Sequence, residues 1–108
     1  MRNFKYSEYK MPLNINRECI RIMRDRKRLE NILKESDGEY DMEESQAYER
    51  LDAIHRALLE IPYEYRKAVV ESTFKRQKNI EMYIHENTLK KYKSKFLYHL
   101  AKNLSLYW

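Results

Sequence analysis

The chain has 108 residues and a formal net charge of +5, with 43% hydrophobic and 36% charged residues. One glycine and two prolines leave little material for strands, so we expect a single all-α domain whose core needs no metal or disulfide. Cys19 is the only cysteine, which excludes an intramolecular disulfide and fits a cytoplasmic protein. No apolar run approaches the roughly 18 residues of a membrane span, and no signal peptide is evident, so we expect no membrane partner.

The charge is divided into three blocks along the chain. Residues 1–34 carry +6, residues 35–61 carry −7 and residues 62–108 carry +6. Basic blocks of this kind suit a polyanion, because lysine and arginine neutralise phosphates. The acidic block can neutralise one basic block within the molecule, which leaves the other for nucleic acid.

Residues 1–12 are expected to form an N-terminal arm, which Tyr6 and Tyr9 could anchor on the domain. Asn14 is suited to cap a helix, and apolar residues then recur at three- and four-residue steps, which predicts four to five helices in all and one helix over about 14–33. Its apolar face consists of Ile15, Cys19, Ile22, Leu29 and Leu33, and its basic residues are Arg17, Arg21, Arg24, Arg26, Lys27 and Arg28.

A turn at Gly38 separates this helix from an acidic one. Gly38 can adopt positive φ, and the 4-3-4-3 spacing of apolar residues predicts a second helix over about 42–60. The two helices would form an antiparallel hairpin over residues 13–61, which we expect to provide dimerisation or a partner contact. The arginine run would either pair with carboxylates such as Glu43 and Glu49 or contact phosphates directly, and the sequence leaves both alternatives open.

Residues 62–108 are predicted to form a helix-turn-helix-like unit. Pro62 favours the start of a helix over about 63–76, and a short helix or turn follows at about 79–84. The alternative is one continuous helix over 63–84, without a helix-turn-helix.

The last helix, over about 88–104, has an apolar side and a basic side. At 100° per residue its apolar residues fall within about 140° of arc, with Lys93 as the exception among them. The stripe consists of Leu89, Tyr92, Phe96, Leu97, Leu100 and Leu104, and Tyr98 is expected on the outer side. Asn87 or Thr88 would cap the helix.

The N-terminal half of this helix is the predicted DNA-reading surface. A recognition helix contacts bases and phosphates through its N-terminal half, and lysine, asparagine and hydroxyl side chains supply the polar atoms required. The residues expected to face the major groove are Asn87, Thr88, Lys90, Lys91, Ser94 and Lys95. Those expected to hold phosphates are Arg66, Lys67, Lys75, Arg76 and Lys78.

Two stretches, "LLEIPYEYRKAVVESTF" and "ENTLKKYKSKFLYHLAKNL", together resemble the sigma-70 region 4 type of helix-turn-helix over about residues 50–104. In that family an apolar-proline pair opens a helix with a Tyr-Arg pair, here Ile61-Pro62 and Tyr65-Arg66, and the recognition helix begins with Thr-apolar-Lys, here Thr88-Leu89-Lys90. The pattern looks most like small phage or mobile-element regulators of the ArpU/RinA type. The resemblance implies a transcriptional regulator that binds double-stranded DNA, with RNA polymerase and a second copy of the chain as further candidate partners.

Candidates for enzymatic chemistry are lacking. His55 and His99 are expected to be packing or surface residues, and His85 has no second ligand at metal spacing. Cys19 is expected to be a small core residue, and one glycine rules out a glycine-rich phosphate loop. We therefore expect no catalytic residues, no metal and no cofactor. The alternative to DNA binding is a non-enzymatic helical adaptor that docks a charged protein partner.

Overall fold

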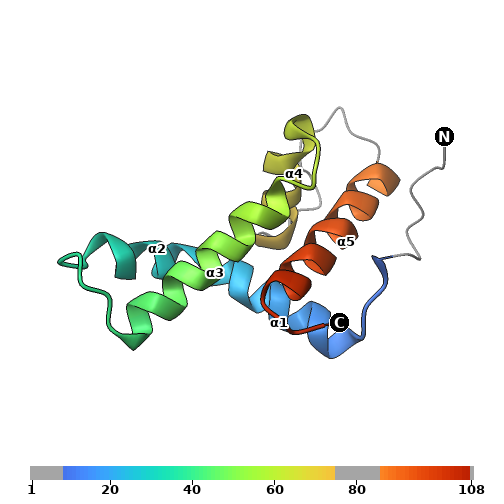
Figure 1. Cartoon of the computed structure of the whole chain (residues 1–108). Coiled ribbons are helices and arrows are strands. Elements are labelled where there is room, and N and C mark those ends of the chain that lie inside the picture. Colours follow the sequence, from blue (N-terminus) through green and yellow to red (C-terminus); the bar gives the residue numbers. More distant parts are fainter. Residues whose placement is uncertain (1–8, 75–85, 108) are drawn as a thin grey trace.

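A computed structural model describes residues 9–74 and 86–107, and within these ranges the chain is helical without strands, which confirms the all-α prediction. The helices are α1 (Leu13–Arg24), α2 (Arg26–Lys34), α3 (Met42–Leu58), α4 (Tyr63–Phe74) and α5 (Glu86–Asn103) (Figure 1). Residues 75–85, including the predicted turn at 79–84, lie outside the described residues.

The single helix predicted over 14–33 is in fact two helices, because the helical hydrogen bonding is interrupted at Asp25. The Asp25 N–H is shared between the carbonyls of Arg21 and Ile22, at 3.1 and 3.2 Å, while its own carbonyl begins the hydrogen bonding of α2. The predicted cap at Asn14 is also wrong. Pro12 is the N-cap, and its carbonyl accepts from two amides of the first turn, so Asn14 lies inside the helix.

Helix α2 and the first half of α3 form an antiparallel hairpin lobe, residues 26–50, that projects from the rest of the molecule (Figure 1). Gly38 turns the chain with φ of 101°, as predicted, and Asp41 caps α3 by accepting from the Glu44 N–H at 2.8 Å. Leu29 and Ala47 are buried between the two helices. The hairpin prediction is therefore confirmed for α2 and α3.

One hydrophobic core joins α1, α3, α4 and α5. Helix α1 packs against α4 and α5, and α5 also packs against α3. The core crosses the boundary between the predicted segments 13–61 and 62–108. Its buried residues are Met11, Cys19, Ile22, Met23, Ala53, Ile54, Ala57, Ile61, Val69, Phe96, Leu97, Leu100 and Ala101.

Helix α5 begins at Glu86, so Asn87 and Thr88 lie in its first turn instead of capping it. Its C-terminal end is a Schellman motif, in which the Leu106 N–H donates to the Ala101 carbonyl at 2.8 Å and the Ser105 N–H to the Lys102 carbonyl at 3.1 Å. Ser105 has φ of 58° and occupies the left-handed position that glycine usually takes. The Asn103 side chain also donates to the Ala53 carbonyl at 3.1 Å, which fixes this end of α5 on α3.

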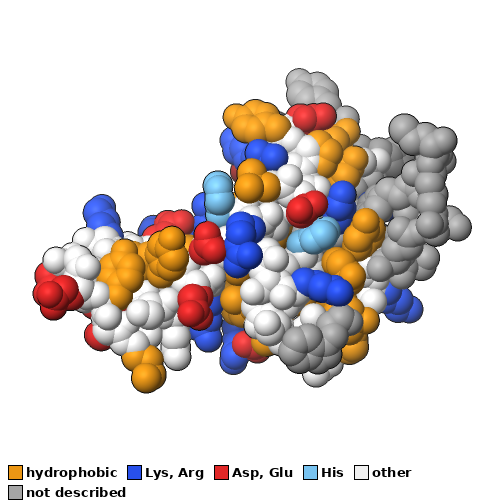
Figure 2. Space-filling view, viewed as in Figure 1, with side chains coloured by type: hydrophobic (Ala, Val, Ile, Leu, Met, Phe, Trp, Pro, Cys, Tyr) orange, Lys and Arg blue, Asp and Glu red, His pale blue; other side chains and the backbone are white. Residues whose placement is uncertain are grey.

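The projecting lobe makes the molecule elongated. Its extents are 46 × 32 × 26 Å and its radius of gyration is 14.7 Å, against about 13 Å for a compact chain of this length. Acidic side chains gather at the far end of the lobe (Figure 2).

Candidate nucleic-acid interface

The apolar stripe predicted along the last helix anchors α5 in the core. Phe96, Leu97 and Leu100 are buried, and Ala101 beside them is fully buried as well. The first half of the helix is more open: Lys90 and Lys91 are exposed, and Thr88, Ser94 and Lys95 are half-buried. We call these five residues the lysine face. The side chain of Asn87, the sixth predicted groove residue, lies outside the described part.

The lysine face is held in place from α4. The Tyr65 and Tyr92 rings stack with centroids 4.7 Å apart and planes inclined by 23°, which ties the first turn of α4 to the second turn of α5. Since Tyr92 follows Lys91 directly, this stack orients the exposed lysines relative to the core.

The predicted phosphate contacts differ in their surroundings. Lys67 is exposed, but the Arg66 Nε donates to the Ile61 carbonyl at 2.9 Å, and its guanidinium lies 5.6 Å from the centre of the Tyr63 ring. Arg66 therefore holds the turn between α3 and α4. The other three predicted contacts, Lys75, Arg76 and Lys78, lie outside the described residues.

Lys93, predicted to lie within the apolar arc, is half-buried between helices. Its Nζ donates to the Ser72 carbonyl of α4 at 3.3 Å. Burial lowers the pKa of Lys93, and the positive charge of Arg24 on α1 lowers it further. Lys93 thus links α5 to α4.

Tyr98 does not continue the outer strip as predicted, because it belongs to an aromatic cluster with the N-terminal arm. The Tyr9 and Tyr98 rings meet edge to face with centroids 5.3 Å apart, and Tyr107 lies 6.1 Å from Tyr98 on another side. Tyr9 therefore contacts α5, whereas Tyr6 and the rest of residues 1–8 lie outside the described residues.

A second basic surface lies where α1 and α2 meet α3, and it includes arginines for which the sequence left phosphate contact open. We call it the arginine groove. It encloses about 490 Å³ and is lined by Glu18, Arg21, Ile22, Arg24, Asp25, Arg28 and Arg50. The spacing of Arg21, Arg24 and Arg28 at steps of three and four residues is the sequence signal that places them on one side.

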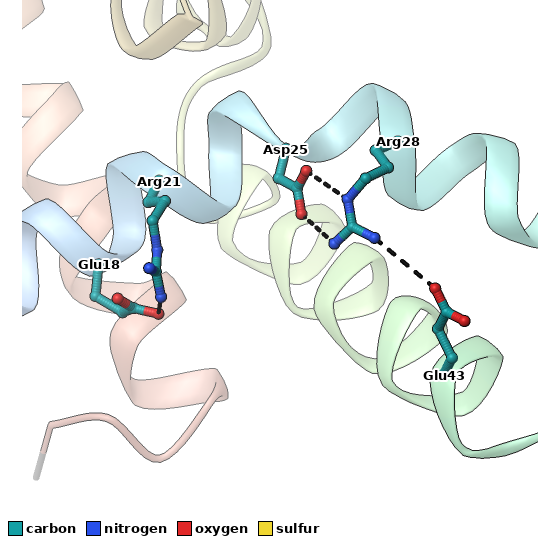
Figure 3. Close-up of polar contacts among 5 residues, drawn as sticks. All are labelled: Glu18, Arg21, Asp25, Arg28 and Glu43. Atoms are coloured by element: carbon teal, nitrogen blue, oxygen red, sulfur yellow. Dashed lines mark hydrogen bonds and ion pairs between the residues drawn. The ribbon is translucent and has the colours of Figure 1, made fainter.

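Carboxylates of the same helices orient two of these arginines (Figure 3). Arg28 forms a bidentate pair with Asp25, with distances of 2.7 and 2.5 Å, and Arg21 pairs with Glu18 at 2.7 Å. Hydrogen bonding from Arg28 lowers the pKa of the Asp25 carboxyl, and the charges of Arg28, Arg50 and Arg21 lower it further.

The expected pairing of the arginine run with the acidic helix is limited to one contact among the described residues, Arg28 to Glu43 at 3.9 Å (Figure 3). The other ion pairs that these arginines form are local, at steps of three or four residues along α1 and α2. The helices are therefore held together mainly by their apolar faces.

Cys19 is confirmed as a core residue. It is fully buried, its Sγ lies 3.7 Å from the Leu97 carbonyl oxygen, and burial raises the pKa of its thiol to about 12. Within residues 9–74 and 86–107, no group of three histidine, cysteine or acidic side chains is arranged to hold a metal ion.

The described part of the chain thus defines a small helical protein with two basic surfaces, the lysine face and the arginine groove. None of its described helices combines the length and apolarity needed to cross a membrane. Comparison of the sequence and structure with protein-family models, curated proteins and solved structures gives no match.

Proposed function

We propose that this protein binds duplex DNA as a transcriptional regulator, with the lysine face of α5 in the major groove. The observation that carries the proposal is the division of α5 into a buried C-terminal half and an open, lysine-bearing N-terminal half. A helix that enters a groove needs this division, because its far end must be anchored while its first turns reach bases and phosphates.

Charge supports the same proposal. The lysine face carries three lysines, and no aspartate or glutamate occurs between Asn87 and Trp108. Phosphate contacts release counterions from DNA, so each lysine that meets a phosphate strengthens binding at low salt. The regulatory role is inferred from the resemblance of residues 50–104 to the sigma-70 region 4 helix-turn-helix.

The direct test is a double substitution of the two exposed lysines, Lys90→Gln with Lys91→Gln. Fluorescence anisotropy would measure binding to a labelled 30-base-pair duplex pool and to duplexes selected from it. We expect the dissociation constant to rise by about 10- to 100-fold, and the slope of log affinity against log salt to flatten by about two.

The matched control is Lys27→Gln with Lys34→Gln, which removes the same charge from two exposed lysines of α2. Since α2 is not part of the proposed interface, this variant should bind within about threefold of the unmodified protein. Equal losses in both double variants would mean that only net charge matters. Absence of duplex binding by the unmodified protein at 50 mM salt would refute the proposal.

A helical adaptor is the second candidate, and three exposed apolar side chains on α3, after it and at the start of α4 favour it. Tyr48 is 52% exposed, Leu59 is 56% exposed and Tyr63 is 81% exposed. Residues 48 and 59 lie on the same side of a helix, since eleven residues make about three turns. An adaptor would retain its protein partner when the lysine face is neutralised and lose it on Tyr48→Ala with Leu59→Ala.

A further inference from the structure

One side of the hairpin lobe changes from basic to acidic along its length. On α2 and its C-terminal cap, Arg28, Asn31 and Glu35 follow at steps of three and four residues, so they share a side. On α3, the residues Glu43, Gln46 and Arg50 also follow at steps of three and four and share a side. Here the acidic residue comes first along the chain and the basic residue last. The ion pair between Arg28 and Glu43, and the presence of Arg28 and Arg50 in one groove, place both rows on the same side of the lobe.

The basic end of this side is the arginine groove, which has an excess of positive charge. Four guanidinium groups line it against two carboxylates, those of Glu18 and Asp25. Both carboxylates are already paired with arginines three residues further along the chain. Among the described residues no carboxylate forms an ion pair with Arg24 or Arg50, so these two charges are available to an anionic partner.

The other end is an acidic tip, residues 35–44, at the turn of the lobe. It contains six carboxylates and no basic residue. Glu35, Glu39 and Glu43 are exposed, and within the described ranges 9–74 and 86–107 the tip forms one ion pair, the 3.9 Å contact from Arg28 to Glu43. A surface of this kind attracts arginine and lysine side chains.

We propose that two copies of the chain associate through this side of the lobe, antiparallel and related by a twofold axis. Residues 43 and 50 are separated by about 10 Å along α3, so a twofold axis midway between them, near Gln46, brings Glu43 of each copy to Arg50 of the other. The same axis passes near Asn31 and brings Glu35 to the second copy's Arg28.

The hairpin's own geometry allows one axis to serve both helices. The Ser36 hydroxyl donates to Glu44, which sets the register of the antiparallel pair and places Asn31 and Gln46 within about one helical turn of the same level. Both amides are exposed, and at the axis each can hydrogen-bond its own symmetry mate. A second copy is therefore the partner that satisfies the arginine groove and the acidic tip together.

This association goes beyond DNA binding and does not depend on it. The contacts are mostly charged and polar, so the dimer should be modest in affinity and should weaken as salt screens its ion pairs. The lysine face is not part of the contact, since it lies on α5.

Charge reversal tests the proposal, with sedimentation velocity without DNA at 50 mM salt as the measurement. Glu43→Arg or Arg50→Glu alone should raise the dimer dissociation constant by about tenfold or more, because each change introduces two like-charge contacts per dimer. The double variant Glu43→Arg/Arg50→Glu restores opposite charges across the axis and should return to within about threefold of the unmodified protein.

Glu49→Arg is the control, because it makes the same charge change on another side of α3, and circular dichroism would verify that each variant keeps its helices. A protein that stays monomeric up to about 0.5 mM overturns the proposal. So does a dimer that tolerates both single reversals, which would indicate another face. If the protein is monomeric and Arg50→Glu weakens its binding to DNA, the arginine groove binds DNA instead of a second copy.

Discussion

Lys93 lies on the apolar side of α5, and its charge is unfavourable there in the folded state. Burial lowers its pKa below the ordinary value of 10.5, and the nearby Arg24 adds repulsion. A lowered lysine pKa means that the unfolded chain binds its proton more tightly than the folded chain. Between the pKa of Lys93 in the folded state and 10.5, the free energy of unfolding therefore rises with pH. Below that pH range Lys93 is charged in both states, and the buried charge lowers the free energy of unfolding by its full amount.

We predict that Lys93→Met raises the free energy of unfolding at pH 7 by about 0.5–1 kcal/mol, since methionine fills the same space without a charge. The advantage over the unmodified protein should shrink as pH rises towards 10.5. Urea denaturation of both proteins at several pH values measures this difference, and Lys91→Met, at an exposed position, should change stability by less than about 0.3 kcal/mol. A destabilised Lys93→Met protein would show that the bond to Ser72 outweighs burial.

At the scale of single helices, apolar spacing predicted the core side of α5 well but missed the break at Asp25. The residues around Asp25 keep a helical spacing and include no glycine or proline, and Asp25 itself has right-handed helical angles, so neither the spacing nor a helix-breaking residue indicates a break. The break follows from packing: α1 lies on α4 and α5, whereas α2 turns away to pair with α3. The part of Arg50 in the arginine groove was missed for the same reason, because Arg50 joins the other arginines only in the folded chain.

The end of α5 offers a test of backbone conformation. We predict that Ser105→Gly raises the free energy of unfolding by about 0.5–1 kcal/mol, because glycine adopts the φ of 58° without the penalty that serine incurs. Gly38→Ala makes the opposite change, from glycine to a residue that disfavours positive φ. We expect it to lower the free energy of unfolding by about 1 kcal/mol. No atom lies within 4 Å of the added methyl group, so this loss would come from the φ of 101° alone. Thermal unfolding measures both, and a destabilised Ser105→Gly would count against the Schellman motif.

At the scale of the whole molecule, the core links the two halves of the chain. The buried residues of α5 are in one cluster with residues of α1 and α3. These are Cys19, Ile22 and Met23 of α1 and Ala53 and Ile54 of α3. The sequence predicted each half from its own pattern, but it held no information on which apolar faces would meet.

We therefore predict that residues 62–108, expressed alone, do not fold. Without α1 and α3, the buried side chains of α5 would face water, and the contact between α4 and α5 buries too little apolar surface to compensate. Urea titration followed by circular dichroism should show no cooperative transition for this segment and a single transition for the full chain. A cooperatively folded segment would establish residues 62–108 as an independent domain.

The continuity of α3 has a consequence for the spacing of the DNA half-sites that a dimer would bind. Its 17 residues span about 25 Å without interruption, and Ala53, to which the Asn103 side chain fixes α5, lies about 17 Å along the helix from the acidic tip. In a dimer joined by its lobes, the continuous helix α3 would connect the lobe to α5 in each copy. It would therefore fix the distance between the two α5 helices. The protein would then accept only operators whose half-sites have one spacing, and inserting a few base pairs between half-sites would abolish cooperative binding.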